Sequence, residues 1–485
     1  MPDTRGQLDE SDLLVTRNLV GGSWISGKGT PIAVDDPFTL DLVAEVTSVG
    51  AAEAQAAVDA ARDAFPAWAA RPAAERGAIL RRWAELIERH EDDLARLITR
   101  ENGKHLREAH GEVAYGNGFM HFYAEEATRV LGEIIPAPVS GRRLYARPEA
   151  LGVAAAITPW NFPLAMLTRK AAPALAAGCT MVAKPASQTP LTALAFAKLG
   201  EEAGLPKGVF NIVTGSASAI GKVLTQSPVV RKLSFTGSTE IGVMLAEQCM
   251  GTMKRISMEL GGNAPLVILD DADLDTAVET AMVAKFRNGG QSCIAANRIY
   301  VQQGLRDAFL DAFAAKVDDM KAGDGFDDSV DIGPMIDAAA LEKIDEHRED
   351  ALSRGAELLA GGGSPGGRLS VPTLLADVPA DAKLAHEETF GPLAGVIAFD
   401  TVEQAIALAN DTEFGLAAYL CSSDPARIDH VASKLESGMV GINTGLISTP
   451  HAPFGGVKMS GVGKEGSHHG IEEYLNRKYV CHAGL

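Results

Sequence analysis

The residue with the clearest chemical potential is Cys293, in the segment GGQSCIAANR. Cysteines that only fill a core have apolar neighbours, as Cys179 and Cys421 do, whereas Cys293 follows two glycines, a glutamine and a serine. If a helix begins here, its backbone N–H groups would lower the pKa of the thiol and would also bind an oxyanion formed on a substrate. The pattern therefore favours a nucleophile at Cys293 over a structural thiol.

Two further polar side chains would assist such a nucleophile. Glu259 ends an apolar run in MELGGNAP, and a carboxylate with bulky apolar neighbours can have a raised pKa and act as a general base. Asn161 lies between Pro159 and Pro163 in TPWNFP, where two prolines stiffen a loop that could hold an electrophile-polarising amide. A surface glutamate in a turn and an asparagine that caps its own backbone are the alternatives, and both remain open.

A phosphate-binding turn is best matched by KLSFTGSTEIGVMLAEQ. An apolar strand stops before Gly237 and Ser238, a helix follows at once, and Gly242 closes the turn, so free N–H groups would face a pyrophosphate. The segments GVGKEG and GGGSPG match glycine-rich phosphate motifs, but no buried strand precedes them, and we interpret both as loops. Lys184 ends a strand in VAKPASQTP, where it would bind a cofactor hydroxyl or phosphate or remain solvated.

Elements that could position these residues alternate along the chain. Short apolar runs such as GVAAAITPW, TMVAKP and VFNIVTG are separated by stretches of helical length, which is typical of βαβ units and a parallel sheet. The pattern restarts beyond residue 260 with RIYVQQG and later GLAAYLCSS. This predicts an α/β fold with two parallel-sheet domains. The segment 140–152 and the C-terminal YLNRKYVCHAGL are expected to form a strand pair that leaves the body of the subunit and meets a partner chain.

Composition excludes several classes of function. The 485-residue chain has 63 acidic and 44 basic residues and a net charge of −19, which argues against nucleic acid as a partner. Its five cysteines are far apart and form no C-x-x-C pair, so we expect neither a disulfide framework nor a metal site. No apolar stretch reaches the length of a membrane span. We expect a cytoplasmic protein with neither a membrane nor a nucleic acid partner.

The chain resembles the aldehyde dehydrogenase superfamily through six segments that occur in the same order and at similar spacing: TPWNFP, FTGSTEIG, MELGGNAP, GGQSC, EETFGPL and APFGGVKMSG. Within the superfamily it is most similar to the succinate-semialdehyde dehydrogenases, through KPASQTPLTAL, DTEFGLAAYL and GINTGLIS. The resemblance implies two Rossmann-like domains and a small β extension that makes a homodimer or homotetramer. The implied boundaries are 1–132 and 152–259 for cofactor binding, 260–468 for catalysis, and 133–151 and 469–485 for the oligomerisation strands.

The resemblance also implies catalytic roles. Cys293 would attack the aldehyde to give a thiohemiacetal, whose oxyanion the Asn161 amide and the Cys293 N–H would hold. Hydride transfer to the nicotinamide would leave a thioester, and Glu259 would activate water to hydrolyse it. Glu465 matches a second carboxylate near a proton path.

For the cofactor, the resemblance implies that Lys184 and Glu388 hold the two riboses and that the turn from Gly237 to Gly242 meets the pyrophosphate. Trp160 and Phe390 would lie beside the nicotinamide. NAD-preferring relatives often have a glutamate at the position of Ser187, and its carboxylate would repel a 2′-phosphate. We therefore expect NADP as the cofactor, with NAD also accepted.

For the substrate, Arg169, Arg287 and Ser448 match residues that bind a distal carboxylate, which a pair of guanidiniums can grip. Without the resemblance, each arginine would be interpreted as a solvated helix residue. The expected reaction is oxidation of succinate semialdehyde to succinate. Glutarate semialdehyde or a broader set of aldehydes is the alternative, because a tunnel discriminates one methylene by only about 1–3 kcal/mol. A cysteine hydrolase or esterase, which would need a histidine near Cys293, and a non-catalytic homologue are more remote alternatives.

Overall fold

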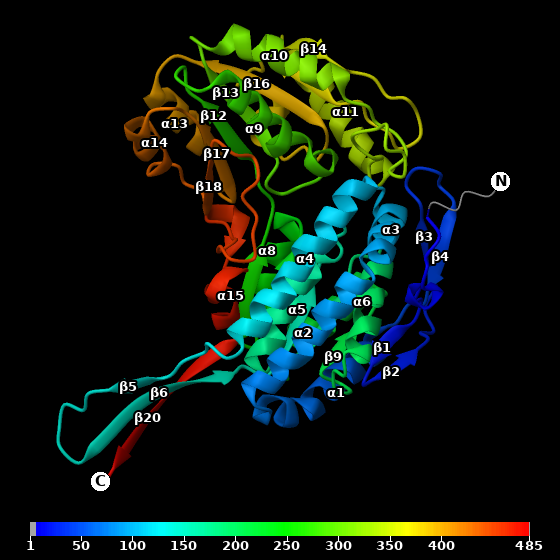
Figure 1. Cartoon of the computed structure of the whole chain (residues 1–485), viewed down its shortest axis with the longest axis vertical. Coiled ribbons are helices and arrows are strands. Elements are labelled where there is room, and N and C mark those ends of the chain that lie inside the picture. The colour runs from blue at the N-terminus through cyan, green and yellow to red at the C-terminus, as the bar shows by residue number, and fades with distance from the viewer. Residues whose placement is uncertain (1–5, 485) are drawn as a thin grey trace.

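The computed structural model describes residues 6–484 of the chain. In this part the strands form an eight-stranded and a seven-stranded sheet, together with a three-stranded and a two-stranded one. Figure 1 shows the two large sheets in separate lobes, one above the other, with the three-stranded sheet as an arm that projects from the lower lobe. The mixed α/β fold with two parallel sheets, as predicted from the sequence, is confirmed.

The eight-stranded sheet lies in the lower lobe. Strands β11, β10, β7, β8 and β9 are parallel neighbours, and β19, β1 and β2 are antiparallel additions at the edges. In spatial order the strands are β19 (Gly461–Val462), β11 (Arg255–Glu259), β10 (Val230–Thr236), β7 (Val153–Ile157), β8 (Thr180–Lys184), β9 (Phe210–Ile212), β1 (Asn18–Val20) and β2 (Ser23–Ile25).

Helices cover both faces of this sheet because successive strand side chains point to opposite sides. In β7, Ala154 and Ala156 pack in one apolar core, and Val153 and Ala155 pack in another. The first core includes α2 (Ala73–Arg89), α3 (Glu91–Asn102), α4 (Leu106–Glu126), α5 (Ala165–Ala177) and α6 (Leu191–Glu202). The second includes α1 (Ala51–Ala70), α7 (Ala217–Gln226) and α8 (Thr239–Met250).

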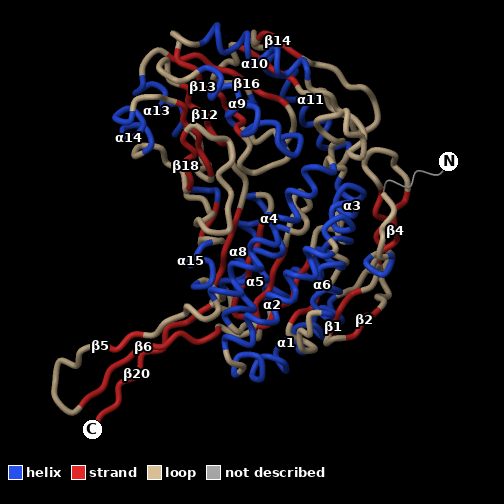
Figure 2. The backbone as a smooth tube through the Cα atoms, viewed as in Figure 1, coloured by secondary structure: helices blue, strands red, loops and turns tan. Residues whose placement is uncertain are grey.

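The seven-stranded sheet forms the upper lobe, where Figure 2 shows its strands beside their helices. All neighbours are parallel except β14 at one edge. In spatial order they are β14 (Glu357–Ala360), β15 (Thr373–Ala376), β16 (Leu393–Phe399), β13 (Ala296–Gln302), β12 (Ala264–Ile268), β17 (Ala417–Cys421) and β18 (Met439–Ile442). The helices of this lobe are α9 (Leu274–Phe286), α10 (Arg306–Asp319), α11 (Ala338–Ser353), α12 (Lys383–His386), α13 (Val402–Asn410) and α14 (Pro425–Ala432).

The arm contains β5 (Glu133–Ile135), β6 (Arg142–Ala150) and β20 (Leu475–Ala483). The predicted pairing of residues 140–152 with the C-terminus is confirmed, since β6 and β20 are antiparallel from Leu475 opposite Ala150 to Ala483 opposite Arg142. The short helix α15 (Ser467–Glu472) leads from the lobes into β20. Strands β3 (Ile32–Asp35) and β4 (Leu42–Val46) form the separate two-stranded hairpin. No helix among the described residues is long and apolar enough to span a membrane.

Candidate active site

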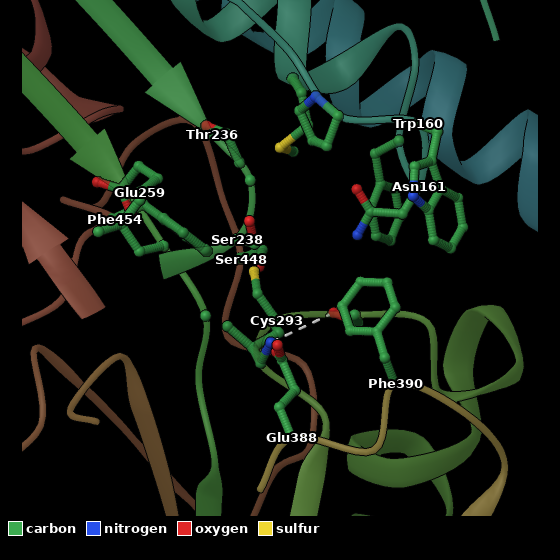
Figure 3. Close-up of a pocket in the computed structure, with 18 of the residues that line it drawn as sticks. Trp160, Asn161, Thr236, Ser238, Glu259, Cys293, Glu388, Phe390, Ser448 and Phe454 are labelled. Atoms are coloured by element: carbon green, nitrogen blue, oxygen red, sulfur yellow. Dashed lines mark hydrogen bonds between the residues drawn. The ribbon is translucent and has the colours of Figure 1, made fainter. Parts of the chain in front are cut away.

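A cavity of about 260 Å³ lies where the carboxyl ends of β7, β10 and β11 face the upper lobe. Such strand ends are the usual ligand-binding edge of a parallel sheet. Figure 3 shows Cys293 near its centre, with Trp160, Asn161 and Phe390 on one side and Glu259 and Phe454 on the other. Its lining also includes Tyr115, Phe162, Arg169, Thr236, Gly237, Ser238, Arg287, Lys343, Glu388 and Ser448. The cavity is therefore lined both by residues near Cys293 in the sequence and by residues far from it.

Cys293 lies in a turn, and no helix begins there. The turn follows the short 3-10 segment Arg287–Gly290 and is closed by a bond from the Ala295 N–H to the Ser292 carbonyl. The pKa of the Cys293 thiol is raised to about 12, chiefly by burial; Arg169 opposes this rise, and the carboxylates of Glu388 and Glu259 contribute to it. The expectation of a helix that lowers the thiol pKa is therefore wrong. Desolvation of the thiolate outweighs the one nearby cation.

Asn161 is buried beside this turn. Its side-chain Nδ2 donates to the Gln291 carbonyl at 3.1 Å, which directs the amide toward the segment before Cys293. The Asn161 carbonyl in turn accepts from Lys104 at 2.9 Å and from Asn288 at 3.1 Å, so tertiary contacts fix the loop in addition to its prolines. An amide nitrogen has two hydrogens, and one remains for a group in the cavity. This geometry is that of a fixed donor, and the alternative of self-capping is not observed.

Glu259 ends β11 and is only 1% exposed. Neither of its carboxyl oxygens has a hydrogen-bond partner among the described residues. Burial raises its pKa well above the usual value and Glu465 adds to the rise, while Arg169 and Lys170 oppose it. The surface-glutamate alternative is therefore wrong. A carboxyl group in this environment holds its proton to higher pH than an exposed one and can act as a general base.

Glu465 does not line the cavity but lies behind it. It forms ion pairs with Arg169 and Lys170 and accepts from the Ser234 hydroxyl at 3.1 Å. Burial by itself would raise the pKa of Glu465, but the two cations lower it below the usual value. Glu465 is thus a buried, ionised counter-charge to Arg169 and Lys170.

Arg169, on α5, lines the cavity and also pairs with Glu465. Its guanidinium lies over the Phe454 ring at 4.2 Å, and its buried Nη2 has no hydrogen-bond acceptor among the described residues. Arg287 lies 5.5 Å from the Phe162 ring centre, and no described carboxylate forms an ion pair with it. Two guanidiniums therefore border the space next to Cys293, one with an unused donor and the other without a carboxylate partner among the described residues.

A second cavity of about 260 Å³ adjoins this end of the first, and both are lined by Arg287, Ser448, Tyr115 and Phe162. The Tyr115 hydroxyl is in hydrogen-bonding contact with Arg169 and with Ser448. Tyr115 was missed by the sequence reasoning because it is one aromatic residue of an amphipathic helix, and nothing in its neighbours distinguishes it. Lys343, a lysine on α11, and Phe454, in the loop before α15, were also missed.

Five of the residues expected to hold a dinucleotide line the cavity: Trp160, Gly237, Ser238, Glu388 and Phe390. Glu388 accepts from the Gly262 N–H at 3.2 Å, and burial raises its pKa to about 7 against the effects of that bond, Lys343 and Lys285. The rings of Phe390 and Trp160 meet edge to face with centres 5.5 Å apart. The cavity therefore has the Glu388 carboxylate as a hydrogen-bond acceptor and the rings of Phe390 and Trp160 as aromatic surfaces.

The turn into α8 and the first turn of that helix are tightly packed at two glycines. A Cβ at Gly237 would lie 2.5 Å from the Phe235 ring, and one at Gly242 would lie 2.2 Å from Leu260. Ser238 is the N-cap residue, yet its hydroxyl makes no cap hydrogen bond. The backbone N–H groups and this hydroxyl are therefore available to an anion.

Besides Glu465, three residues predicted for the site do not line the main cavity: Lys184, Ser187 and Gly242. Lys184 is buried at the end of β8, where its ammonium donates to the Pro185 carbonyl at 3.2 Å and burial lowers its pKa to about 8. Ser187 is half-buried three residues further along the same loop. Both lie at the carboxyl end of β8, the strand that pairs with β7. An extended dinucleotide bound at this edge of the sheet would reach them.

No histidine is found among the described residues that line the main cavity. A cysteine hydrolase takes the proton of its thiol with a neighbouring histidine, so the arrangement lacks the base that this alternative requires.

Comparison with known proteins gives consistent matches over the whole length. Residues 24–480 match the model of the aldehyde dehydrogenase family. The chain is 54% identical to succinate-semialdehyde dehydrogenase [NADP(+)] of Escherichia coli over 98% of this chain and 99% of that one. It is 52% identical to glutarate-semialdehyde dehydrogenase of Pseudomonas aeruginosa over 99% and 100%. A crystal structure of an aldehyde dehydrogenase from Brucella melitensis superposes with a TM-score of 0.98 at 54% identity and 99% coverage of both chains.

Proposed function

The chain belongs to the aldehyde dehydrogenase family, and from this premise we propose that it oxidises succinate semialdehyde to succinate with NADP⁺. One observation carries the substrate: the cavity that holds Cys293 is lined by Arg169, whose Nη2 has no acceptor among the described residues, and by Arg287, with which no described carboxylate forms an ion pair. The relative from Escherichia coli bears the name of this activity and of this cofactor, which supports the same assignment.

The cofactor-side residues fit a dinucleotide. The glycine turn before α8 and the unused Ser238 hydroxyl would take the pyrophosphate, and Glu388 would accept from the ribose beside the nicotinamide. Lys184 would bind the other ribose, and Trp160 and Phe390 would flank the nicotinamide. When bound, the cofactor supplies the hydride acceptor. Preference for NADP⁺ is supported by Ser187, which presents no charge to a 2′-phosphate.

In the first half-reaction, Cys293 would release its proton to solvent, and its sulfur would form a bond to the aldehyde carbon. The carbonyl oxygen becomes an oxyanion, which the free Asn161 amide hydrogen and the Cys293 N–H would stabilise. Loss of hydride from the same carbon restores the carbonyl as a thioester. The raised thiol pKa means that substrate and cofactor must supply part of the stabilisation of the thiolate.

In the second half-reaction, Glu259 would take a proton from water as the water attacks the thioester. The C–S bond then breaks, and the products are the carboxylate and the Cys293 thiol. The two unpaired oxygens of Glu259 are free to face that water. Glu465 would act at a distance, through its charge, to raise the proton affinity of Glu259, against the effects of Arg169 and Lys170.

For the substrate, the distal carboxylate would lie between Arg287 and Ser448, with Tyr115 and Arg169 as further donors. Glutarate semialdehyde is the second candidate, since a relative at 52% identity bears that name. One methylene changes the binding free energy by only about 1–3 kcal/mol.

The test is steady-state formation of reduced cofactor with succinate semialdehyde, glutarate semialdehyde and an uncharged aldehyde of similar length, each with NADP⁺ and NAD⁺. Strong selectivity for the two semialdehydes supports the arginine pocket, and their ratio selects between them. Equal turnover of the uncharged aldehyde would contradict the proposed substrate, and equal efficiency with NAD⁺ would contradict the cofactor preference.

We also propose that the protein is a cytoplasmic homodimer or homotetramer. Support for association comes from large apolar side chains exposed on the arm and on α8, namely Ile134, Tyr479, Ile241, Met244 and Met250. Support for a reducing compartment comes from five cysteines that form no disulfide. Light scattering that shows a monomer would contradict the assembly.

A further inference from the structure

The loop that carries Glu388 and Phe390 is held in an unfavourable conformation. Phe390 has a φ of 60°, in the left-handed region that a bulky side chain rarely occupies. The next residue, Gly391, packs so closely against α11 that a Cβ there would lie 2.3 Å from Ile344. Since both Glu388 and Phe390 line the cavity, their placement depends on whatever fixes this backbone.

Between them, Thr389 is directed away from the cavity and into the protein. Its hydroxyl lies 3.0 Å from Nδ1 of His347, and both residues are almost completely buried. His347 lies on α11, one turn beyond Lys343, which lines the cavity. The helix thus contacts the loop on both sides of Glu388.

The second imidazole nitrogen of His347, Nε2, lies 3.3 Å from the Glu387 carboxylate. Burial lowers the pKa of His347, and Lys343 lowers it further, although Glu387 and Glu346 oppose them. The ring is therefore neutral near pH 7. With the proton on Nε2, its Nδ1 accepts from the Thr389 hydroxyl, whereas Nε2 lies near Glu387 without a hydrogen bond to any described residue. The Glu387 side chain is 55% exposed, so this second contact is screened and contributes less than the buried one.

We infer that His347 is a positioning residue for the dinucleotide: its buried hydrogen bond to Thr389 holds Glu388 and Phe390 in the conformation that receives the cofactor. The residue does not line the cavity and acts only through the loop. The inference rests on the proposed function for the identity of the cofactor alone.

The test uses two amides that each reproduce one nitrogen of the ring. In H347N the amide occupies the position of Nδ1 and keeps a partner for Thr389, whereas in H347Q it occupies the position of Nε2 and loses that partner. Binding of NADPH to the full-length enzyme without aldehyde is measured by fluorescence titration. We expect the Kd of H347Q to rise about fivefold to tenfold, as for a lost buried hydrogen bond, and that of H347N to stay within about twofold of the original enzyme.

A second variant keeps the test decisive if a His347 variant does not fold. T389V replaces the hydroxyl by a methyl group of similar size, and we expect the same weakening of NADPH binding. H347Q and T389V combined should weaken binding no more than either alone, because both remove one contact. Two control variants should keep the Kd for NADPH within about twofold of that of the original enzyme. T280V changes a buried threonine of α9 outside this loop, and E387Q removes only the charge of the exposed partner.

Turnover gives a further readout. The KM for NADP⁺ should rise while the KM for the aldehyde stays constant. Unchanged NADPH binding in both H347Q and T389V, or equal weakening in H347N and H347Q, would overturn the inference. Because the titration contains no aldehyde, an error in the substrate assignment would change the turnover results and leave this result intact.

Discussion

The guanidinium of Arg169 is paired inside the protein with Glu465, although the same side chain lines the cavity that holds Cys293. Arg287 lines that cavity too, but no described carboxylate pairs with it. The two arginines therefore have different roles. Arg169 balances a buried charge as well as bordering the substrate space, whereas Arg287 is free to bind an anion.

Replacement of each arginine should distinguish the structural role from the substrate-binding role. R169M leaves Glu465 buried with Lys170 as its remaining cation, and we expect a loss of about 3–5 kcal/mol in the free energy of unfolding, measured by urea denaturation. R287M should change this free energy by less than about 1 kcal/mol. A larger loss in R287M than in R169M would contradict the assignment.

The same R287M variant should raise the KM for succinate semialdehyde roughly tenfold to a hundredfold, because charged hydrogen bonds contribute about 1.5–3 kcal/mol. Kinetics with an uncharged aldehyde serve as the control and should be unchanged. R287K, which keeps the charge but loses the planar fork, should lie between the two. Equal losses with both aldehydes would indicate that Arg287 only shapes the tunnel.

Glu259 should give the deacylation step a pH dependence. Its pKa is raised, so the base is protonated at low pH, and turnover should increase as the pH rises through that pKa. E259Q should still release one equivalent of reduced cofactor in a rapid-mixing experiment and then stop, with the acyl group retained on Cys293. Mass spectrometry of the quenched enzyme detects that thioester. Continued turnover in E259Q at the original rate would exclude Glu259 as the base.

The raised pKa of Glu259 also has a consequence for stability. The folded state holds this proton more tightly than the unfolded state, so the stabilising contribution is complete below the unfolded value near 4.5 and is lost as the pH rises through the folded pKa. The melting temperature of the original enzyme should therefore fall relative to that of E259Q as the pH rises above the unfolded value near 4.5. A difference that does not change with pH would contradict this sign.

The Cys293 thiol should be slow to alkylate in the free enzyme. Its pKa is raised to about 12, so the thiolate is scarce near pH 7 and the rate of iodoacetamide labelling should still increase above pH 9. Peptide mapping distinguishes this residue from the exposed Cys481, which is the internal control. A labelling rate at Cys293 that is already maximal at pH 7 would contradict the raised pKa.

Ser187 should control the choice of cofactor. In S187E a carboxylate would face the 2′-phosphate, and we expect kcat/KM with NADP⁺ to fall at least about tenfold, a loss of roughly 1.4 kcal/mol. With NAD⁺ the value should stay constant or rise, since a carboxylate can accept from the 2′-hydroxyl. S187A is the matched control, and steady-state kinetics with both cofactors make the comparison.

Local pattern was enough to predict the fold class and three candidate catalytic residues, whereas Arg169, Arg287, Glu388 and Phe390 were implied only by the resemblance to a family. The alternation of apolar runs and helical stretches indicated two parallel sheets, and the exposed strands at 140–152 and the C-terminus were predicted to pair, as β6 and β20 do. Residue types and their near neighbours singled out Cys293, Glu259 and Asn161, which meet in one cavity. These properties depend on the periodicity of apolar residues and on the loops that follow strands, and both can be recognised in short segments of sequence.

Tertiary structure alone decided the electrostatics. The sequence predicted a thiol with a lowered pKa at Cys293, but the pKa is raised because the turn is buried and two carboxylates from other segments approach it. The pairing of Arg169 with Glu465, and the contact of His347 with Thr389, join residues far apart in the chain. Desolvation and charge pairing depend on which distant elements pack together, and no local pattern records that packing.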